Sequence, residues 1–444
     1  MTTTPETIDL LIEPRWIATV DSDTPLSHHA VAIHNERIVA VQPIHEARTR
    51  FDPVSHIKLP EHILIPGLIN LHTHAAMTLM RGIADDLPLM DWLQKHIWPI
   101  EGAHMSPQFV YDGTRLACAE MLKGGITCFN DMYFYPDAAA SAASGIGMRA
   151  MLGITTLEFP TPYASDASDY INKGLAVRQD WLDNPLINFC LAPHAPYTVS
   201  DTTFERTLTL SEQLNLPIHC HIHETAQEIN DSLQQYGQRP LQRLQKLGLL
   251  GPSLIGVHAV HLNDDDLNLL AETGSNIAHC PTSNLKLASG FAPVAKMRQM
   301  NINVGFGTDG AASNNRLDMF AEMRLASLLA KGVSGSAQAL PAHEVLRMAT
   351  LDAARALGLA EQIGSITPGK QADLCAVSLS SLETRPCYDP VSHLINVAGR
   401  EQVTHVWVAG KCCVDNKTLL KHKQNDLESA IALWQNSLEF RQQP

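Results

Sequence analysis

The pattern of hydrophobic and polar positions changes twice along the chain. The N-terminal segment contains alternating runs such as "IDLLIEP" and "HAVAIHNERIVAV", which predict short strands joined by polar turns, with a hairpin tip at Asn35 and Glu36. The same texture returns in residues 363–416, for example in "VTHVWVAGKCCVDN". We therefore expect a small β-sandwich domain built from both chain ends, residues 1–62 and 368–420.

The middle of the chain follows a different rhythm, in which a short apolar run precedes a segment with helical periodicity such as "DGTRLACAEMLKGG" or "DDLNLLAETG". The apolar runs predict eight strands, near residues 68–73, 126–131, 149–155, 187–193, 218–223, 254–260, 276–280 and 302–308. Eight strands alternating with helices predict an α/β fold, a parallel (β/α)8 barrel whose active site lies at the C-terminal ends of its strands. We assign residues 63–367 to this barrel and residues 421–444 to a C-terminal helix.

The amino-acid composition limits the cellular compartments and the binding partners that we expect for this protein. The chain has 32 Lys and Arg residues against 46 Asp and Glu residues, a net charge of −14, and this field repels phosphate backbones and anionic lipids. The nine cysteines form no Cys-x-x-Cys pair, which is typical of a reducing cytoplasm. No apolar run approaches the length of a membrane span, and no basic region precedes an apolar one at the N-terminus. We expect a cytoplasmic protein with neither a nucleic-acid nor a membrane partner.

Histidines and carboxylates gather where the predicted strands end. His72 and His74 stand two residues apart in "LINLHTHAAM", so both imidazoles share one face of a strand. Because the ends of all barrel strands meet at one rim, we expect these side chains to converge with others that follow later strands. The later residues are His194, His221, Glu224, His258 and Asp309.

This set of residue types favours metal-dependent hydrolysis. Three neutral imidazoles and one carboxylate suit Zn²⁺, and Fe²⁺ accepts the same ligand types. Such an ion lowers the pKa of a bound water to about 7 and so supplies hydroxide at neutral pH. Glu224 can protonate a ring nitrogen or a leaving group, while His258 and Asp309 can orient or deprotonate the attacking water. Alternation in "HCHIHE" leaves open which histidine is the ligand: His219, His221 or His223.

Five segments closely resemble the amidohydrolase superfamily, in particular its branch that deaminates 5'-methylthioadenosine and S-adenosylhomocysteine. They are "PGLINLHTH", "HETAQE", "GVHAVHL", "AHCPTSNLKLASG" and "GTDGAASNN", and the resemblance covers nearly the whole chain. It implies a homo-oligomer and one divalent metal held by His72, His74, His221 and Asp309. The branch lacks the carboxylated lysine of its two-metal relatives, and no predicted strand end here carries an obvious lysine. A mononuclear site is therefore implied.

The same resemblance assigns roles to further residues. It implies that Glu224 shuttles a proton to the purine N1 and that His258 polarises the metal-bound water. Glu101 in "WPIEG" matches the glutamate that binds both ribose hydroxyls, and His194 in "PHAPY" matches the histidine that contacts the purine. Arg149 in "GMRAML" matches an arginine near the 5' substituent.

The implied reaction is hydrolytic deamination of a purine nucleoside to the inosine analogue. A metal-bound hydroxide adds to C6 while Glu224 protonates N1, and ammonia leaves with a proton routed through Asp309 and Glu224. Family members that accept S-adenosylhomocysteine carry a second arginine, whereas the segment "TTLEFPTPYASDASDYINKG" offers only Lys173 among apolar residues. A carboxylate binds best to a guanidinium, and a methylthio group to an apolar wall. We expect 5'-methylthioadenosine to be preferred, with S-adenosylhomocysteine and adenosine as further candidates.

Two other interpretations stay open. One is deamination or dechlorination of another aminated heterocycle, such as guanine, cytosine or a triazine, although Glu101 argues against a bare base. The other is a scaffold that has lost its metal, which predicts a missing ligand, whereas all four ligands are present. Sequence alone assigns no role to His279 and Asn284 after the seventh strand. It leaves Trp92 and Trp98 as parts of a core helix or of a lid.

Overall fold

The computed structural model describes residues 5–421 and 424–439, and its largest feature is a sheet of eight parallel strands whose spatial order follows their order in the sequence. The main chain of Asp309, just after the last strand, donates a hydrogen bond to the carbonyl of His72 in the first strand at 3.0 Å, so the two edges meet. The strands are β6 Leu68–Thr73, β7 Ile126–Asp131, β8 Arg149–Thr156, β9 Ile187–Pro193, β10 Ile218–Ile222, β11 Leu254–His258, β12 Asn276–His279 and β13 Asn303–Phe306. The predicted (β/α)8 barrel is confirmed.

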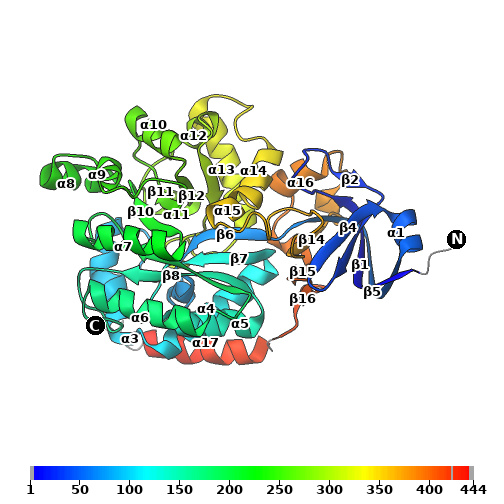
Figure 1. Cartoon of the computed structure of the whole chain (residues 1–444), viewed down its shortest axis with the longest axis horizontal. Coiled ribbons are helices and arrows are strands. Elements are labelled where there is room, and N and C mark those ends of the chain that lie inside the picture. The colour runs from blue at the N-terminus through cyan, green and yellow to red at the C-terminus, as the bar shows by residue number, and fades with distance from the viewer. Residues whose placement is uncertain (1–4, 422–423, 440–444) are drawn as a thin grey trace.

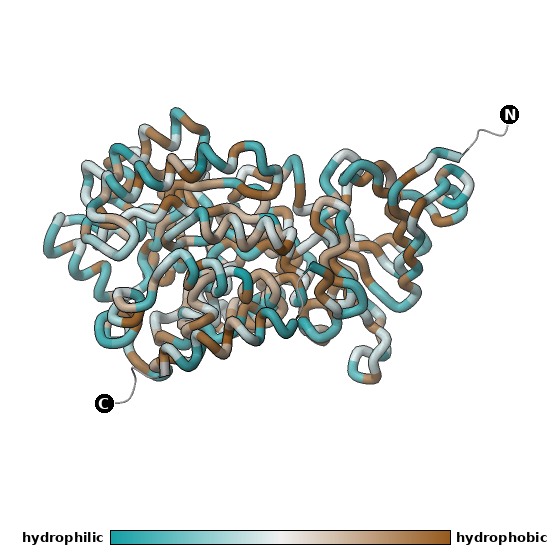
Figure 2. The backbone as a smooth tube through the Cα atoms, turned by 90° about the horizontal axis from the view of Figure 1, so that it is seen from below, coloured by the Kyte–Doolittle hydropathy of each residue, from teal (hydrophilic) through white to brown (hydrophobic). Residues whose placement is uncertain are grey.

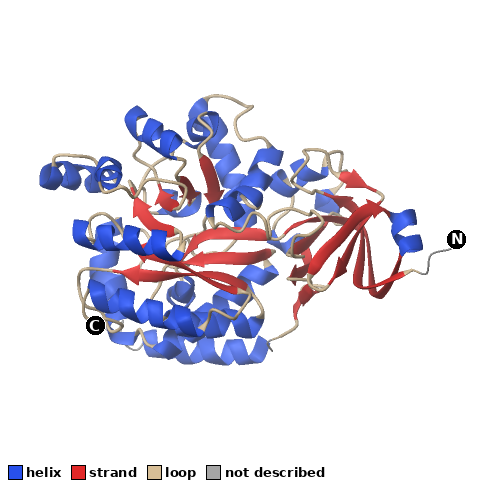
Figure 3. Cartoon of the chain, viewed as in Figure 1, coloured by secondary structure: helices blue, strands red, loops and turns tan. Residues whose placement is uncertain are grey.

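Helices surround this barrel and place its strands in the interior (Figures 1 and 3). The outer turns of the molecule are mostly hydrophilic, whereas hydrophobic stretches run through the interior (Figure 2). The helices are α4 Pro107–Lys123, α5 Pro136–Ile146, α6 Ala167–Asp180, α7 Asp201–Leu214, α8 Ala226–Tyr236, α9 Pro240–Lys246, α10 Asp264–Thr273, α11 Pro281–Lys286, α12 Val294–Gln299, α13 Met319–Ser334, α14 Ala342–Met348 and α15 Leu351–Ala356.

Local sequence signals begin and end the longer of these helices. The side chain of the residue before the helix accepts a hydrogen bond from the first turn, as Ser106 does for α4 and Asn263 for α10. Gly237 after α8 and Gly274 after α10 adopt left-handed backbone angles that end their helices at little cost. These caps turn the chain back toward the next strand, which is what a barrel requires.

Both chain ends contribute to a second sheet, which lies beside the barrel (Figure 1). Its nine strands are β1 Glu6–Ile17, β2 Leu26–Ser27, β3 His29–His34, β4 Arg37–Pro43, β5 Phe51–Pro66, β14 Leu374–Ser378, β15 Val403–Val408, β16 Lys411–Asp415 and β17 Thr418–Leu419. The hairpin between β3 and β4 turns at Asn35 and Glu36, both with positive φ, as predicted. Ile33 and Trp407 come from strands far apart in the sheet order yet share one hydrophobic cluster, so the sheet curls around its own core as a sandwich does. Helices α1 Ile44–Arg50 and α16 Pro390–Asn396 belong to the same terminal segments of the chain.

The C-terminal helix α17, Gln424–Glu439, packs along α4 of the barrel (Figure 1). Trp434 stacks edge-on against Phe109 with 5.1 Å between ring centroids, and its indole N–H donates to Asp112 at 3.0 Å. Residues 422–423 and 440–444 of the predicted helical segment lie outside the described residues, as do residues 1–4 of the predicted sandwich. Among the described helices, none is both long and apolar enough to cross a membrane.

The segment after β6 crosses the C-terminal rim of the barrel before α4 begins. It contains a 3-10 turn, Ala75–Met80, then α2 Leu89–Trp92, a π-helical turn Leu93–Ile97, and α3 Trp98–His104. Trp92 and Trp98 both line the cavity described below, so this segment contributes a wall of that cavity as well as part of the core.

Candidate active site

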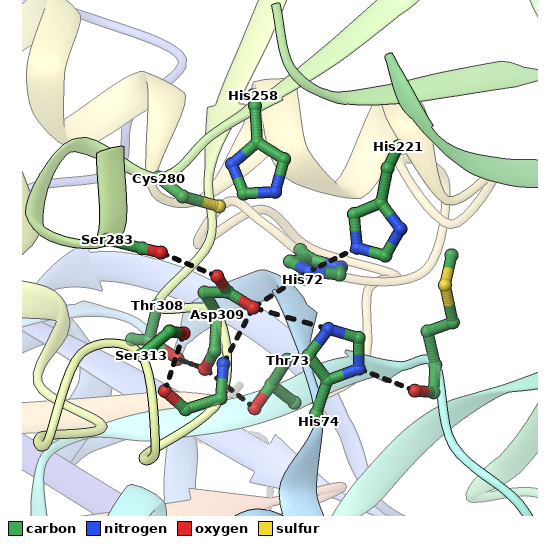
Figure 4. Close-up of polar contacts among 12 residues, drawn as sticks. His72, Thr73, His74, His221, His258, Cys280, Ser283, Thr308, Asp309 and Ser313 are labelled. Carbon is green, nitrogen blue, oxygen red and sulfur yellow. Dashed lines mark hydrogen bonds and ion pairs between the residues drawn. The ribbon is translucent and has the colours of Figure 1, made fainter. Parts of the chain in front are cut away.

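The four residues expected to bind a metal lie at one point of the barrel rim (Figure 4). Nε2 of His72 lies 3.2 Å from Oδ1 of Asp309, and Nε2 of His74 lies 3.3 Å from the same oxygen. Nε2 of His221 is 3.3 Å from Nε2 of His72. Among the described residues, His72, His74 and Asp309 form one group able to hold an ion, and His72 and His221 form another with His258.

Hydrogen bonds on the far side of each ring determine which nitrogen faces the cluster. Nδ1 of His74 donates to the carbonyl of Met132 at 2.6 Å, and Nδ1 of His221 donates to the carbonyl of His194 at 2.8 Å. A carbonyl only accepts, so each Nδ1 carries the proton and each Nε2 presents a lone pair to the cluster. Burial lowers the pKa of His72 to about 4 and that of His221 well below its usual range, so both rings stay neutral.

This donor set fits a divalent metal such as Zn²⁺. Tetrahedral Zn²⁺ with metal–nitrogen distances of about 2.0–2.1 Å separates its ligand atoms by about 3.3 Å, which agrees with the distances from His72 to Asp309, from His74 to Asp309 and from His72 to His221. Lone pairs facing one another and a carboxylate in a buried site repel unless a cation lies between them. Ser283 donates to Oδ2 of Asp309 at 2.6 Å, which turns Oδ1 toward the histidines.

Glu224, on the loop that follows β10, and His258, the last residue of β11, stand next to this cluster. Nε2 of His258 is 3.7 Å from Oε2 of Glu224, and Ser289 donates to Oε1 of Glu224 at 3.4 Å. Burial raises the pKa of Glu224 against the opposing effect of His258, so its protonated form is accessible nearer neutral pH than in water. Nδ1 of His258 donates to Oδ1 of Asn284 at 2.8 Å, which leaves Nε2 facing the site.

The backbone turns sharply where these side chains leave their strands. The φ angles of His223, His258 and Asp309 are 52°, 72° and 61°, a left-handed region that non-glycine residues rarely occupy. Glu228 holds one of these turns because its two carboxylate oxygens accept the backbone N–H groups of His223 at 2.9 Å and Glu224 at 2.8 Å. Backbone strain of this kind persists where the surrounding structure imposes it, and it is common at functional sites.

A cavity of about 230 Å³ opens above the cluster. Seven of the predicted site residues line it: His74, Glu101, His194, His221, Glu224, His258 and Asp309. His72 is fully buried beneath them. The other walls are largely apolar or aromatic, and among the described lining residues none is a lysine or an arginine.

Glu101 in α3 is a buried carboxylate at the wall of this cavity. Tyr133 donates to its Oε1 at 2.7 Å, and burial raises its pKa to about 7 despite that hydrogen bond. Trp98, one turn earlier in α3, faces Phe159 across the cavity wall with 6.2 Å between ring centroids. Glu101 therefore offers an acceptor in a wall that is otherwise suited to apolar groups.

The structure does not bring Arg149 to this site, which corrects the expectation that it contacts the 5' substituent. Arg149 opens β8 at the opposite end of the barrel, whereas Thr155, which lines the cavity, is six residues further along, roughly 20 Å at about 3.3 Å per residue. Its guanidinium donates to Asp373 at 2.9 and 3.1 Å and also to Gln371. Arg149 precedes its strand, and in a parallel barrel that position indicates the amino end, so only the match of "GMRAML" to the family motif had placed it near the substrate.

Several residues of the site carried no clear signal in the sequence. Ser283, Glu228 and Tyr133 contact predicted residues through one or two hydrogen bonds each, and their partners become visible only once the loops are placed in space. The spacing of "HETAQE" could have indicated Glu228, since a carboxylate in the first turn of a helix can accept main-chain N–H groups just before that turn. Asn284, unassigned from sequence, contacts His258.

A parallel eight-stranded barrel whose carboxyl rim holds clustered histidines and an aspartate, with a buried glutamate alongside, defines a metal-dependent hydrolase. Residues 63–413 match the family model described as the amidohydrolase family. This chain therefore belongs to the amidohydrolase family, as the motifs had indicated, and the interpretation as a non-catalytic scaffold is not supported.

Individual proteins of this family are similar to the chain over nearly its full length. The chain is 49% identical over 432 residues to a 5-methylthioadenosine/S-adenosylhomocysteine deaminase of Saccharophagus degradans, with 97% of each chain covered. It is 44% identical over 433 residues to a protein of the same description from Teredinibacter turnerae, with 97% of this chain and 98% of that one covered. Among solved structures, a zinc-bound adenosine deaminase from Xanthomonas campestris is 50% identical with a TM-score of 0.97, covering 98% of this chain and 100% of that one.

Proposed function

We propose that this protein hydrolytically deaminates 5'-methylthioadenosine to the corresponding inosine derivative and ammonia. One observation carries the proposal: residues of the metal site, the protonatable Glu224 and the buried acceptor Glu101 all line the same cavity, and its other walls are largely apolar. An aminopurine riboside with an uncharged 5' tail matches these features. The names of the relatives in Saccharophagus and Xanthomonas support deamination of an adenosine-type nucleoside.

In this proposal one divalent ion, Zn²⁺ with Fe²⁺ as the alternative, would be held by His72, His74, His221 and Asp309. Such an ion activates water as a nucleophile at neutral pH. The bound zinc of the 50% identical structure supports the choice of Zn²⁺. Metal analysis of the purified protein, before and after incubation with a chelator, tests both the identity and the number of ions.

The side chains of the chain itself supply the proton transfers. Glu224, whose pKa is raised by burial, gives a proton to N1 of the purine while a water attacks C6. The water loses two protons in the reaction: one restores Glu224, and the other, passed on by Asp309 and Glu224, converts the leaving amino group to ammonia. Nε2 of His258, kept free by the hydrogen bond from Nδ1 to Asn284, orients the nucleophile. His194, half-buried at the rim, contacts the purine ring, and Glu101 accepts the ribose hydroxyls.

The absence of a cation from the described cavity walls favours 5'-methylthioadenosine over S-adenosylhomocysteine. An amino-acid carboxylate buried there would lose its hydration without gaining a guanidinium partner. Lys173, the cation in the segment after β8, donates to the carbonyl of Tyr163 and to Asp169, both at 2.8 Å, and is already engaged. The thioether of 5'-methylthioadenosine instead suits the aromatic wall of Trp98 and Phe159.

The test compares kcat/KM of the zinc-loaded protein for 5'-methylthioadenosine, S-adenosylhomocysteine, adenosine and guanine. We expect 5'-methylthioadenosine to exceed S-adenosylhomocysteine by about tenfold or more, the equivalent of about 1.4 kcal/mol. Phe159→Arg should narrow this ratio, whereas Phe159→Met and Lys173→Met should leave it unchanged. A preference for S-adenosylhomocysteine would overturn the specificity, and turnover of guanine alone would favour the alternative of another aminated heterocycle.

Two further parts of the proposal concern the assembly and the compartment. The family resemblance favours a homo-oligomer, which light scattering of the purified protein tests. All nine cysteines are free, which is consistent with a cytoplasmic location, and fractionation of cells that express the protein checks it.

A further inference from the structure

A second, much smaller cavity is lined by Asn284, whose side chain is hydrogen-bonded to His258. It holds about 10 Å³ and is bounded by residues after β12, by the loop that precedes α12 and by α13. Two polar side chains line it, His279 at the end of β12 and Asn284 in α11. Sequence alone assigned a role to neither.

Each of these two side chains has a buried polar atom without a partner. Nδ1 of His279 and Nδ2 of Asn284 make no hydrogen bond within the described structure, although the residues are only 4% and 1% exposed. Buried polar groups in folded proteins are nearly always paired, with protein or with ordered water. Two such groups on one small cavity therefore point to something that fills it.

The size of the cavity matches one water molecule. A space of about 10–15 Å³ in this measure holds a single water, provided that at least two polar groups bind it. Nδ2 of Asn284 is a donor. Burial lowers the pKa of His279 to about 3, which keeps the ring neutral, and in the tautomer protonated at Nε2 its Nδ1 is an acceptor. A water can accept from the first and donate to the second.

We propose that one ordered water joins Asn284 to His279, and that this chain of hydrogen bonds positions His258 for the reaction. Nδ2 is the unpartnered amide atom of Asn284, so it is the atom available to the water, while Oδ1 is directed at His258. That oxygen accepts the Nδ1 proton of His258 at 2.8 Å. The opposite orientation would present an N–H to Nδ1 and force the proton onto Nε2, the nitrogen that lies 3.7 Å from Oε2 of Glu224.

The arrangement positions His258 and does not conduct protons away from it. An amide neither gains nor loses a proton near neutral pH, so Asn284 holds the ring in one tautomer and leaves proton transfer to the Nε2 side. His279 and Asn284 are thus positioning residues, which act on the substrate only through His258. This inference rests on the deamination proposed above, but its first test does not depend on activity.

The first test is a high-resolution crystal structure of the zinc-loaded protein. We expect one ordered water within hydrogen-bonding distance of Nδ1 of His279 and Nδ2 of Asn284, with Oδ1 of Asn284 directed at His258. An empty cavity, or an amide that refinement and its hydrogen bonds place the other way round, overturns the inference. Neither outcome bears on which nucleoside the enzyme accepts.

The second test uses variants of the cavity. His279→Leu removes the partner of the water, and we expect kcat to fall about 10- to 100-fold with KM changed less than about threefold, as for other supporting residues of a metal centre. His279→Gln keeps a polar atom and should recover most of the loss. Phe291→Leu alters the same cavity without touching the hydrogen bonds and serves as the matched control.

A purely structural role for His279 gives a different result. The melting temperature of His279→Leu would then fall, while kcat per folded, metal-loaded molecule would equal that of the wild type, and the inference would be wrong. If His279→Leu does not fold, the crystal structure of the wild-type protein and the kinetics of His279→Gln still decide between the two.

Discussion

The two ends of the barrel bury charged side chains in different ways. At the amino end, the side chains of Arg149 and Asp373 are each 1% exposed and are joined at 2.9 Å, and both have further hydrogen bonds. At the carboxyl rim, Glu101 and Glu224 are also buried, yet neither is paired with a lysine or arginine among the described residues. Burial raises the pKa of each of them.

This difference separates buried charges that hold the structure from those that act on a ligand. A buried ion pair with all its hydrogen bonds made has no capacity left for a substrate, and breaking it leaves an uncompensated charge. A buried carboxylate without a cation is costly to the fold, but its free acceptor and shifted pKa are available for binding and proton transfer. Each of the following predictions changes one end and leaves the other intact.

The largest effect is expected from Asp309→Ala, which removes the oxygen shared by His72 and His74. We expect both the bound metal and the deaminase activity to be lost, as they should be in His221→Ala. Metal content by mass spectrometry and the deamination rate check this. Arg149→Met is the control from the other end of the barrel and should bind metal normally; full metal occupancy in Asp309→Ala would remove Asp309 from the ligand set.

The next effect is expected from Glu224→Gln, which keeps the shape of the side chain and removes its proton. General acid catalysis contributes about 10²–10⁴-fold, so we expect kcat to fall by that amount while the metal stays bound. The amide also relieves the cost of burying a carboxylate, and the melting temperature should not fall. A near-normal rate in Glu224→Gln would mean that another group protonates the purine.

The contrast between the two ends of the barrel also explains which residues of the site could be predicted from the sequence. Strand-ending residues such as His72, His221 and Asp309 were predictable because all strands of a parallel barrel point the same way, so position in the strand gives the end of the barrel. The eight predicted strands agree with the observed ones within two residues at each end for the same reason: continuous apolar runs are typical of strands buried on both faces.

Partners that are distant in sequence could not be predicted in this way. Arg149 and Asp373 are 224 positions apart, and nothing local in "GMRAML" indicates that the curled sheet supplies the carboxylate. The contact of Asn284 with His258 spans 26 positions and depends on how the loop after β12 turns toward β11. Sequence periodicity indicates where the helices and strands lie and which way their side chains point, whereas contacts between loops depend on the completed fold.

A smaller effect, confined to stability, is expected from Arg149→Met at the amino end. Removing one partner of a buried ion pair costs about 3–5 kcal/mol because it leaves Asp373 charged and buried. The double variant Arg149→Met/Asp373→Asn keeps an acceptor for the main chain of Ala409 and should recover most of this loss. Denaturant unfolding measures both. If Arg149→Met instead raised the KM for 5'-methylthioadenosine and left the stability unchanged, Arg149 would contact the substrate after all.

The smallest expected effect is the pH dependence that Glu101 gives to the metal-free protein. Its pKa is about 7 in the folded state and about 4.5 in the unfolded chain, so between these values the folded state binds more protons than the unfolded state. The free energy of unfolding must therefore fall as pH rises from about 4.5 to about 7, by up to about 3 kcal/mol, and then level off.

Subtracting the unfolding curves of Glu101→Gln from those of the wild type isolates this contribution, because the other titrating groups are common to both proteins. The difference should vanish near pH 4.5 and favour the variant by pH 7. Tyr133→Phe removes the hydrogen bond that stabilises the carboxylate, so in that variant the decline should continue to a higher pH. A difference that does not change with pH would mean that Glu101 is already compensated, as Asp373 is, and would erase the contrast between the two ends of the barrel.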